Sequence, residues 1–179
     1  MKENNILDVG CGSGFYQDVT KRRGHINFDI LKPKDKIKNF VLGDAHKLPF
    51  RNNAFDVSFF IDVIEHVNNP YECLKELKRV TSNKILVGTP NCLWFPKILR
   101  SLLKGSYEVY PDHIVTFGIP EFKNLLNRVG FTDFSITTMS YREDRVRRKK
   151  TISRILTFSL PNILKGRQIF SVIKTGDKK

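Results

Sequence analysis

The chain has 179 residues and is strongly basic, with 31 lysine and arginine residues against 18 aspartate and glutamate residues, a formal net charge of +13. This length is typical of one globular domain with a sizeable core, so residues 1–179 are expected to form a single domain. No apolar run reaches the roughly 18 residues of a membrane-spanning helix, and no secretory signal pattern opens the chain. Cys11, Cys73 and Cys92 lack metal-binding or redox spacing, which favours reduced thiols and a cytoplasmic location.

A glycine-rich turn follows the first expected strand, Asn5–Val9. Its apolar run is typical of a buried parallel strand, and Gly10, Gly12 and Gly14 permit a tight turn that a ligand can approach closely. A nucleotide-like ligand would lie at the C-terminal end of the strand, over the N-terminus of the next helix. The spacing differs from that of a dinucleotide-binding loop, whose third glycine would fall where the chain has Phe15.

The rest of the chain alternates short apolar runs with helical patterns, which predicts a parallel α/β sheet. The last two strands have no helical pattern between them and are expected to pair directly. Leu31–Lys38 is too short for the usual crossover helix, so a turn or one irregular coil is expected there. The further strands are expected at His25–Asp29, Lys38–Leu42, Phe55–Ile61, Lys84–Thr89, Phe134–Ser140 and Gln168–Lys174. The helices are expected at Gly14–Arg23, Pro70–Val80, Phe95–Leu103 and Pro120–Val129.

Acidic residues follow several of these strands. Asp29 closes the second strand about 20 residues after Gly10, where a carboxylate can accept hydrogen bonds from both hydroxyls of a ribose. Asp44 follows the third strand within Gly43–Phe50, and Asp62 follows the fourth. In a parallel sheet these positions meet at one edge, where ligands bind.

Taken in order, these segments resemble the class I (Rossmann-like) S-adenosylmethionine-dependent methyltransferases over roughly residues 5–140. Asp112–Phe117 and Phe122–Phe131 resemble the corresponding segments of the subgroup that contains the ubiquinone-biosynthesis, or type 11, methyltransferases. The segments that carry the resemblance are Ile6–Gly14, Phe28–Ile30, Gly43–Phe50, Phe55–Val67, Ile85–Asn91, Asp112–Phe117 and Phe122–Phe131.

The resemblance implies a mostly parallel seven-stranded sheet of order 3-2-1-4-5-7-6 with helices on both faces, and S-adenosylmethionine as the cofactor. Asp8 and the glycines are expected at the methionine half, Asp29 at the ribose and Asp44 at the adenine. The full set expected at the cofactor is Asp8, Gly10, Gly12, Gly14, Asp29, Asp44, Ala45, Ile61 and Asp62.

The chain departs from the family at its N-terminus, because the first motif begins within the first few residues. Most members have a preceding helix that helps to cap the cofactor, so this N-terminal cap is expected to be missing. The cofactor pocket would then be unusually open, or closed by another subunit of an oligomer. An incomplete start to the chain is the alternative explanation.

Histidine and carboxylate residues offer candidates for catalysis. Methyl transfer from a sulfonium depends largely on alignment, and a base is needed only when the acceptor loses a proton. His113 is the candidate general base, since histidine titrates near neutrality and the resemblance places it by the substrate cavity. Alternatively, His113 caps a loop or packs beneath it.

A metal site is a less favoured interpretation. Asp62, Glu65, His66 and His113 are similar to the metal-binding tetrad of small-RNA 2′-O-methyltransferases and some ubiquinone-pathway enzymes, in which a divalent ion would lower the pKa of an acceptor hydroxyl. No metal is expected here, because an aspartate replaces the first glutamate of that pattern. Glu65 and His66 are instead expected as hydrogen-bonding groups.

Two stretches combine basic and apolar residues, Trp94–Lys104 and residues 142–158. They suit contact with a membrane surface or a lipid-linked acceptor, although they could equally be solvated faces. Trp94–Lys104 is expected to be a mobile lid over the acceptor pocket, hinged at Gly105, or else an ordinary helix packed on the sheet. Under the lid hypothesis its inner side would carry Tyr107, Tyr110 and His113.

The favoured function is therefore methyl transfer to oxygen, nitrogen or carbon of a small or lipid-linked acceptor. RNA methylation is an alternative, because a nucleic acid would also attract the positive charge, although the sequence has no recognisable RNA-binding module. A catalytically inactive partner subunit is a second alternative.

Overall fold

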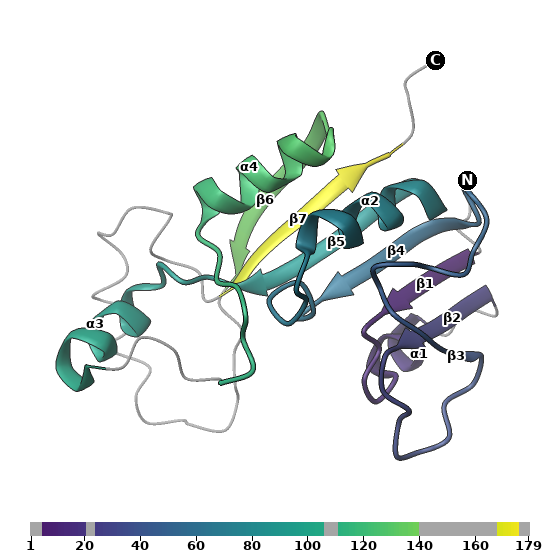
Figure 1. Ribbon diagram of the computed structural model, residues 1–179, viewed down its shortest axis with the longest axis horizontal. Helices are drawn as coiled ribbons and strands as arrows, with labels where there is room; N and C mark the ends of the chain where they lie inside the picture. Colours follow the sequence, from purple (N-terminus) through teal and green to yellow (C-terminus); the bar gives the residue numbers. More distant parts are fainter. Residues whose placement is uncertain (1–4, 21–23, 106–110, 140–167, 176–179) are drawn as a thin grey trace.

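The computed structural model describes residues 5–20, 24–105, 111–139 and 168–175 (Figure 1). These residues form a single sheet flanked by helices. The strands are β1 (Asn5–Val9), β2 (Gly24–Asp29), β3 (Phe40–Leu42), β4 (Phe55–Ile61), β5 (Thr81–Pro90), β6 (Asp133–Met139) and β7 (Gln168–Lys174). The helices are α1 (Phe15–Thr20), α2 (Pro70–Val80), α3 (Phe95–Lys104) and α4 (Ile119–Val129).

The seven strands lie in the order β3-β2-β1-β4-β5-β7-β6. Neighbours from β3 to β5 are parallel, whereas β7 is antiparallel to both β5 and β6. The predicted strand order and the direct pairing of the last two strands are thus confirmed. Because β1, β2, β4 and β5 run in one direction, their C-terminal ends share one edge of the sheet, here called the carboxyl edge.

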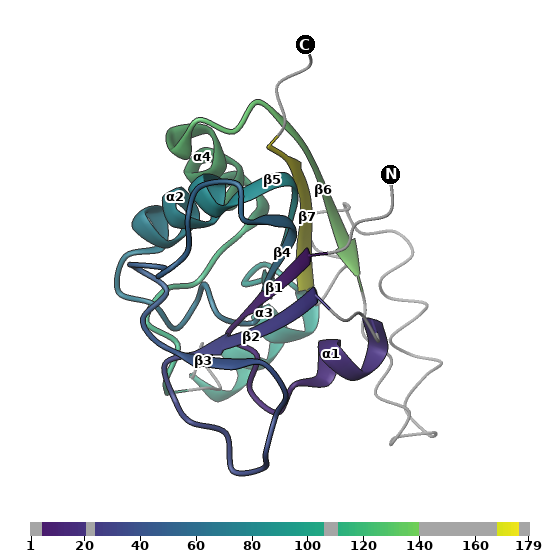
Figure 2. The ribbon, with the colours of Figure 1, turned by 90° about the vertical axis from the view of Figure 1, so that its right-hand side faces the viewer.

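Helices cover both faces of the sheet, as expected. Figure 2 shows α2 and α4 on one face and α1 on the other. Under α2 and α4 the apolar side chains form one continuous core, which includes Phe28, Leu74, Phe122 and Ile173. Burial of this apolar surface is the main stabilising contribution to the sheet.

Helix α2 illustrates how local sequence fixes an element. The Asn69 side chain accepts a hydrogen bond from the backbone N–H of Glu72, and Pro70 occupies the first turn, where its missing N–H costs nothing. Cys73, Leu74, Leu77 and Val80 form its buried face. This spacing is the amphipathic pattern that predicts a helix lying on a sheet.

Several boundaries differ from the prediction, most of them by one or two residues. Strand β5 begins at Thr81 rather than Lys84, because Thr81 pairs with Phe55 across a register shift and its hydroxyl lies 2.6 Å from that of Ser58. Helix α1 is described over Phe15–Thr20, and residues 21–23 of the expected helix lie outside the described residues. The connection between β2 and β3 contains no helix, as its length predicted.

The basic stretch 142–158 lies outside the described residues. Among the helices that the structure describes, none is long and apolar enough to cross a membrane.

Candidate functional site

The glycine-rich turn packs against the end of β2. The backbone N–H groups of Gly10 and Cys11 both donate to the carbonyl oxygen of Phe28, at 2.8 and 3.2 Å. Gly10 has φ 76°, and a Cβ atom at this position would overlap the side chain of Val63. Glycine is therefore required here by both backbone conformation and space. The Val63 contact also connects the turn to the segment that follows β4.

Asp29, at the end of β2, is held by the turns on either side of it. Its Oδ2 accepts a hydrogen bond from the N–H of Gly12 at 3.0 Å, and its Oδ1 accepts one from the N–H of Leu31 at 2.9 Å. Each carboxylate oxygen retains a further acceptor site, so the half-buried group is oriented and still able to bind two hydroxyls.

Asp8 lies beneath the turn with only 2% of its surface exposed. Its Oδ2 has no hydrogen-bond partner and lies 3.9 Å from His25 Nε2, which is also buried without a partner. Burial raises the pKa of the Asp8 carboxyl, and the nearby His25 opposes that rise. An unpaired buried carboxylate oxygen is costly, so this position favours a ligand that brings a hydrogen-bond donor or a positive charge.

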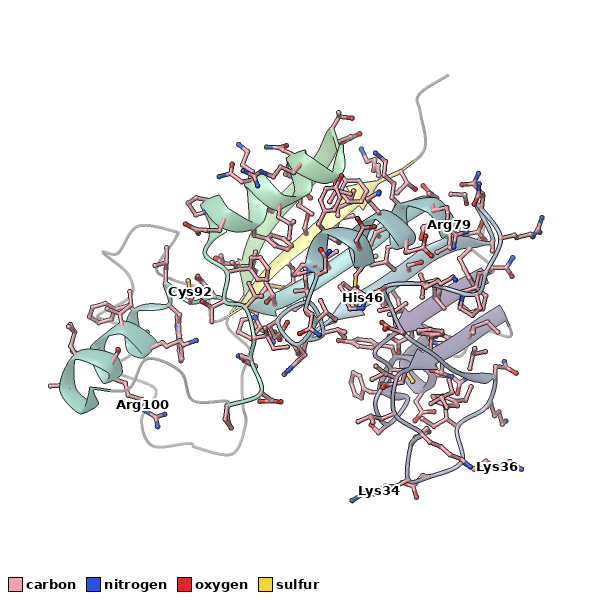
Figure 3. The ribbon with its side chains drawn as sticks, in the orientation of Figure 1. Lys34, Lys36, His46, Arg79, Cys92 and Arg100 are labelled. Carbon is pink, nitrogen blue, oxygen red and sulfur yellow. The ribbon has the colours of Figure 1, made fainter. Side chains whose placement is uncertain are left out.

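Asp44 is exposed and held by His46, a residue that the sequence prediction missed. Asp44 Oδ1 accepts hydrogen bonds from the His46 backbone N–H at 2.9 Å and lies 2.6 Å from His46 Nδ1. The backbone N–H of Asn69 donates to His46 Nε2 at 3.2 Å, which places the ring proton of a neutral His46 on Nδ1, facing Asp44. These bonds lower the pKa of the Asp44 carboxyl. Figure 3 shows His46 between α2 and the β1–β3 strands.

The glycine-turn group is defined here as Asp8, Gly10, Gly12, Gly14, Asp29 and Asp44. The structure places all of these residues at or just beyond the ends of β1, β2 and β3. Large apolar side chains lie exposed beside them, such as Ile30, 65% exposed directly after Asp29. The group thus combines acceptors for polar groups with an apolar surface, which suits a nucleoside-like ligand.

Asp62 follows β4 in an unusual backbone conformation. Its φ of 55° lies in the left-handed region, which is uncommon outside glycine and costs conformational energy. Its N–H donates to the carbonyl of Gly88, and its Oδ1 accepts a hydrogen bond from Gln168 Nε2 at 2.9 Å. Asp62 and the neighbouring Ile61 thus lie at the carboxyl edge, with the Asp62 side chain held by the start of β7.

Glu65, His66 and His113 form the Glu65 cluster. One potential ligand atom from each lies within 4.8 Å of the others. Glu65 is buried, and Thr89 Oγ1 donates to its Oε2 at 3.2 Å. The Glu65 carbonyl accepts the N–H groups of Ile114 and Val115 at 2.8 and 3.1 Å, which ties the His113 segment to the end of β4.

The cluster has the chemistry of an acid–base or metal site. Burial raises the pKa of the Glu65 carboxyl to about 7, so this group exchanges a proton near neutrality. The His66 and His113 rings lie 4.8 Å apart between centroids. Of the tetrad considered from the sequence, Asp62 is not part of this group of potential ligands. The three that come together provide one oxygen and two nitrogen ligands, a set suited to a divalent ion.

Helix α3 begins shortly after β5 ends. Asn91 Oδ1 accepts the N–H of Leu93 at 3.0 Å, and Gly105 ends the helix with φ 65°. None of the α3 side chains that the structure describes is fully buried. This exposure disagrees with the alternative of an ordinary helix packed on the sheet. The hypothesis that Trp94–Lys104 is a mobile lid stays a prediction. Tyr107 and Tyr110 lie outside the described residues.

Cys11 is buried in the turn. Burial raises the pKa of its thiol to about 12, so at neutral pH it is protonated and unsuited to nucleophilic attack. Cys11 is a free cysteine, in agreement with the reduced thiol expected from the cysteine spacing.

Residues 7–84 match the model of the family described as a methyltransferase domain, Methyltransf_11. An uncharacterized protein of Methanocaldococcus jannaschii is 37% identical over 130 residues, covering 68% of this chain and 56% of that protein. A tRNA U34 carboxymethyltransferase of Aliarcobacter butzleri is 28% identical over 167 residues, covering 83% of this chain and 54% of that protein. The chain thus spans little more than half the length of these relatives.

The fold matches solved methyltransferases. A SAM-dependent methyltransferase of Thermotoga maritima, described as a possible histamine N-methyltransferase, superposes with a TM-score of 0.69 at 18% sequence identity. The match covers 98% of this chain and 84% of that one. At this identity the likeness establishes the fold and not the acceptor.

Proposed function

The chain belongs to the class I S-adenosylmethionine-dependent methyltransferases, and we propose that it transfers a methyl group to a small or lipid-linked acceptor. The glycine-turn group would hold the cofactor, with Ala45, Ile61 and Asp62 beside it. The acceptor would lie toward the Glu65 cluster, at the same edge of the sheet. This edge is where ligands of open α/β sheets bind.

The buried Asp8 Oδ2 beneath the glycine-rich turn, which has no hydrogen-bond partner, is the observation that carries this proposal. S-adenosylmethionine has an ammonium group at its methionine end, which would give the Asp8 carboxylate a hydrogen-bond donor and a positive charge in addition to the His25 ring 3.9 Å away. Asp29 has acceptor sites for the two ribose hydroxyls, and Asp44 can accept a hydrogen bond from the adenine amino group. The ammonium, hydroxyl and amino donors of S-adenosylmethionine thus match the carboxylates of Asp8, Asp29 and Asp44 at the carboxyl edge of the sheet.

The chain's own residues would contribute alignment and proton transfer. When bound, S-adenosylmethionine supplies a methyl group that its sulfonium has already activated. His113 would accept the proton of an acceptor hydroxyl or amine on a ring nitrogen, while the acceptor's bond to the methyl carbon forms and the methyl carbon–sulfur bond breaks, leaving the thioether S-adenosylhomocysteine. Glu65, which holds the His113 segment through its carbonyl, would keep that ring at the carboxyl edge.

A divalent ion held by Glu65, His66 and His113 is the alternative chemistry. Such an ion would lower the pKa of an acceptor hydroxyl and leave His113 without a basic role. Dialysis against a chelator, followed by a methyl-transfer assay, separates the two: a His113 base retains activity, whereas a metal site loses it until Mg²⁺ or Mn²⁺ is restored.

RNA remains the second candidate acceptor. The similarity to a tRNA-modifying enzyme covers 83% of the chain, and the net charge of +13 suits a polyanion. A methyl-release assay with total RNA in one arm and a membrane lipid extract in the other separates the acceptors. Methyl transfer is expected in the arm with the lipid extract. Methyl transfer to RNA alone would contradict the proposed small or lipid-linked acceptor.

Calorimetric titration with S-adenosylmethionine tests the cofactor assignment. Asp29→Ala removes both ribose acceptors and should weaken binding by about 1.5–3 kcal/mol, the range for hydrogen bonds to a charged group. Asp133→Ala is the matched control, because its carboxylate pairs with Lys174 at the far edge of the sheet. Equal affinities for wild type and Asp29→Ala would overturn the assignment, and no binding by wild type would favour an inactive partner subunit.

A further inference from the structure

We propose that α3 is a docking helix for an anionic lipid surface. The inference rests on the proposed function and deepens it, since it places the methyl acceptor in a membrane. Its test measures binding to lipid vesicles and does not depend on methyl transfer.

Helical spacing divides α3 into two faces. At about 100° per residue, its apolar residues fall on one arc and its polar residues on the opposite arc. The apolar arc contains Phe95, Ile98, Leu99, Leu102 and Leu103, and the polar arc contains Lys97, Arg100, Ser101 and Lys104. A helix of this kind buries its apolar arc in a core, in a partner or in a membrane interface.

The fold of the described residues covers Phe95 and Ile98 only in part and leaves the three leucines of this arc exposed. Leu102 is 79% exposed and Leu103 is 76% exposed, and Leu99 is exposed as well. Single exposed leucines are common on protein surfaces, but three on one helical face within two turns form a patch that usually marks a binding surface. Figure 1 shows α3 beyond the carboxyl edge of the sheet, away from α2 and α4.

The charge of α3 favours an anionic bilayer as the occupant. The helix contains three basic residues and no acidic one. A helix lying in a membrane interface inserts its apolar arc while basic side chains extend to the lipid headgroups. Phosphatidylglycerol or a similar anionic lipid supplies the charge that complements Lys97 and Arg100.

Nucleic acid fits α3 less well. A polyanion would be bound by a surface of basic side chains, whereas the exposed positions described in α3 are three leucines and a single cation, Arg100. Lys34 and Lys36 of the β2–β3 connection lie at the opposite end of the molecule from Arg100 (Figure 3). These labelled cations thus do not form one continuous surface with α3.

The helix is also joined to the candidate site. Asn91, just before α3, forms a β-bridge with Phe117, and the Cys92 N–H donates to the Phe117 carbonyl at 2.9 Å. Phe117 ends the short segment that carries His113. Ile114, beside His113, is exposed. A bilayer touching α3 would therefore present lipid-linked molecules near the Glu65 cluster.

Vesicle co-sedimentation of the full chain tests the inference. Vesicles of equal parts phosphatidylglycerol and phosphatidylcholine should bind the protein, and pure phosphatidylcholine vesicles should bind it less. Leu102→Ser/Leu103→Ser should lower the partition coefficient by about tenfold or more, because the apolar contacts are lost. Val172→Ser, which changes an exposed apolar residue of β7, should leave the coefficient unchanged.

A charge-reversal pair provides the second arm. Arg100→Glu should reduce binding to the phosphatidylglycerol vesicles at least about fivefold, the factor expected for one cation near an anionic surface. Arg128→Glu on α4 makes the same change in net charge and should have little effect. Circular dichroism melting establishes that each variant is folded.

Two results would overturn the docking helix: no binding of wild type to anionic vesicles, or equal binding by wild type and the leucine variant. RNA that binds wild type while both vesicle types fail to do so would identify a nucleic-acid surface instead. Calorimetry with S-adenosylmethionine on the same proteins keeps the two proposals apart. Lost cofactor binding contradicts the proposed function, whereas lost vesicle binding with normal cofactor affinity contradicts only the docking helix.

Discussion

On one side of the carboxyl edge, the glycine-turn group is held by contacts between segments that are close in sequence, such as Gly12 with Asp29 and His46 with Asp44. On the other side, the groups come from distant parts of the chain: Glu65 contacts Thr89 and the residues after His113, and Asp62 contacts Gln168. The first side is therefore organised largely by local turns. The second requires β4, β5, β7 and the His113 segment to come together before its groups meet.

The largest expected effect tests the chemistry of the distant side. If His113 is the base, His113→Ala should lower the methyl-transfer rate by about 10²–10⁴-fold, the usual contribution of general base catalysis. Affinity for S-adenosylmethionine should be unchanged, because His113 does not belong to the glycine-turn group. If His113→Ala also weakened S-adenosylmethionine binding, the division into a cofactor side and a catalytic side would be wrong.

The next effect tests the glycine-rich turn by replacing Gly10 or Gly12 with alanine, two changes that differ in whether the added Cβ atom has space. Gly10 and Gly12 both have positive φ, but only at Gly10 would a Cβ atom meet another side chain, that of Val63. Gly10→Ala should therefore lower the free energy of unfolding by about 2–4 kcal/mol, from backbone strain and overpacking together. Gly12→Ala should cost about 1–2 kcal/mol, from backbone strain alone. Chemical denaturation without cofactor measures both, and equal costs would contradict the Val63 contact.

The buried Glu65 carboxyl predicts a specific pH dependence. Its pKa is raised from 4.5 to about 7 in the folded protein, so the folded state binds a proton more tightly than the unfolded state does. This contribution makes the protein most stable at low pH, and stability falls as pH rises from about 4.5 to 7, by up to about 3 kcal/mol.

Glu65→Gln isolates that contribution. The variant lacks the titrating group. The free energy of unfolding of the variant minus that of wild type should therefore increase as the pH rises from 5 to 8. Other groups titrate equally in both proteins and cancel in the difference. A difference that does not change with pH would mean that Glu65 is not buried as described.

The smallest effect concerns the contact of His46 with Asp44. His46→Ala removes the imidazole that lies 2.6 Å from Asp44 Oδ1 and should weaken S-adenosylmethionine binding by about 0.5–1.5 kcal/mol. His46→Asn, which retains a side-chain N–H donor, should recover part of the loss. Asn68→Ala is the nearby exposed control, and an equal loss in that variant would assign the effect to the loop rather than to His46.

The pattern of the sequence predicted the strands, the helices and the glycine-rich turn for physical reasons that are local, whereas the strand order and the roles of Asp8 and Asp44 were implied by the family resemblance. Alternating apolar runs and helical periodicity mark strands and helices, and glycines followed by acids at strand ends mark a ligand-binding edge. Asn5–Val9, Phe55–Ile61 and Gln168–Lys174 were predicted with their observed bounds.

The missed features depend on contacts that periodicity does not encode. His46 stands close to Asp44 in the sequence, but its orientation depends on Asn69 at the start of α2. Gln168 meets Asp62 only because β7 inserts between β5 and β6. The exclusion of Asp62 from the Glu65 cluster likewise follows from its left-handed backbone and this hydrogen bond, neither of which the spacing of the residues reveals.

The most direct test of the cofactor side is an amide NMR titration of the full chain with S-adenosylhomocysteine, the product form of the cofactor. The largest shift changes are predicted at Gly10–Gly14, around Asp29 and Ile30, and around Asp44 and Ala45, with only small changes in α4 and β6. Changes centred elsewhere, or none at saturating ligand, would contradict the assignment of the glycine-turn group as the cofactor site.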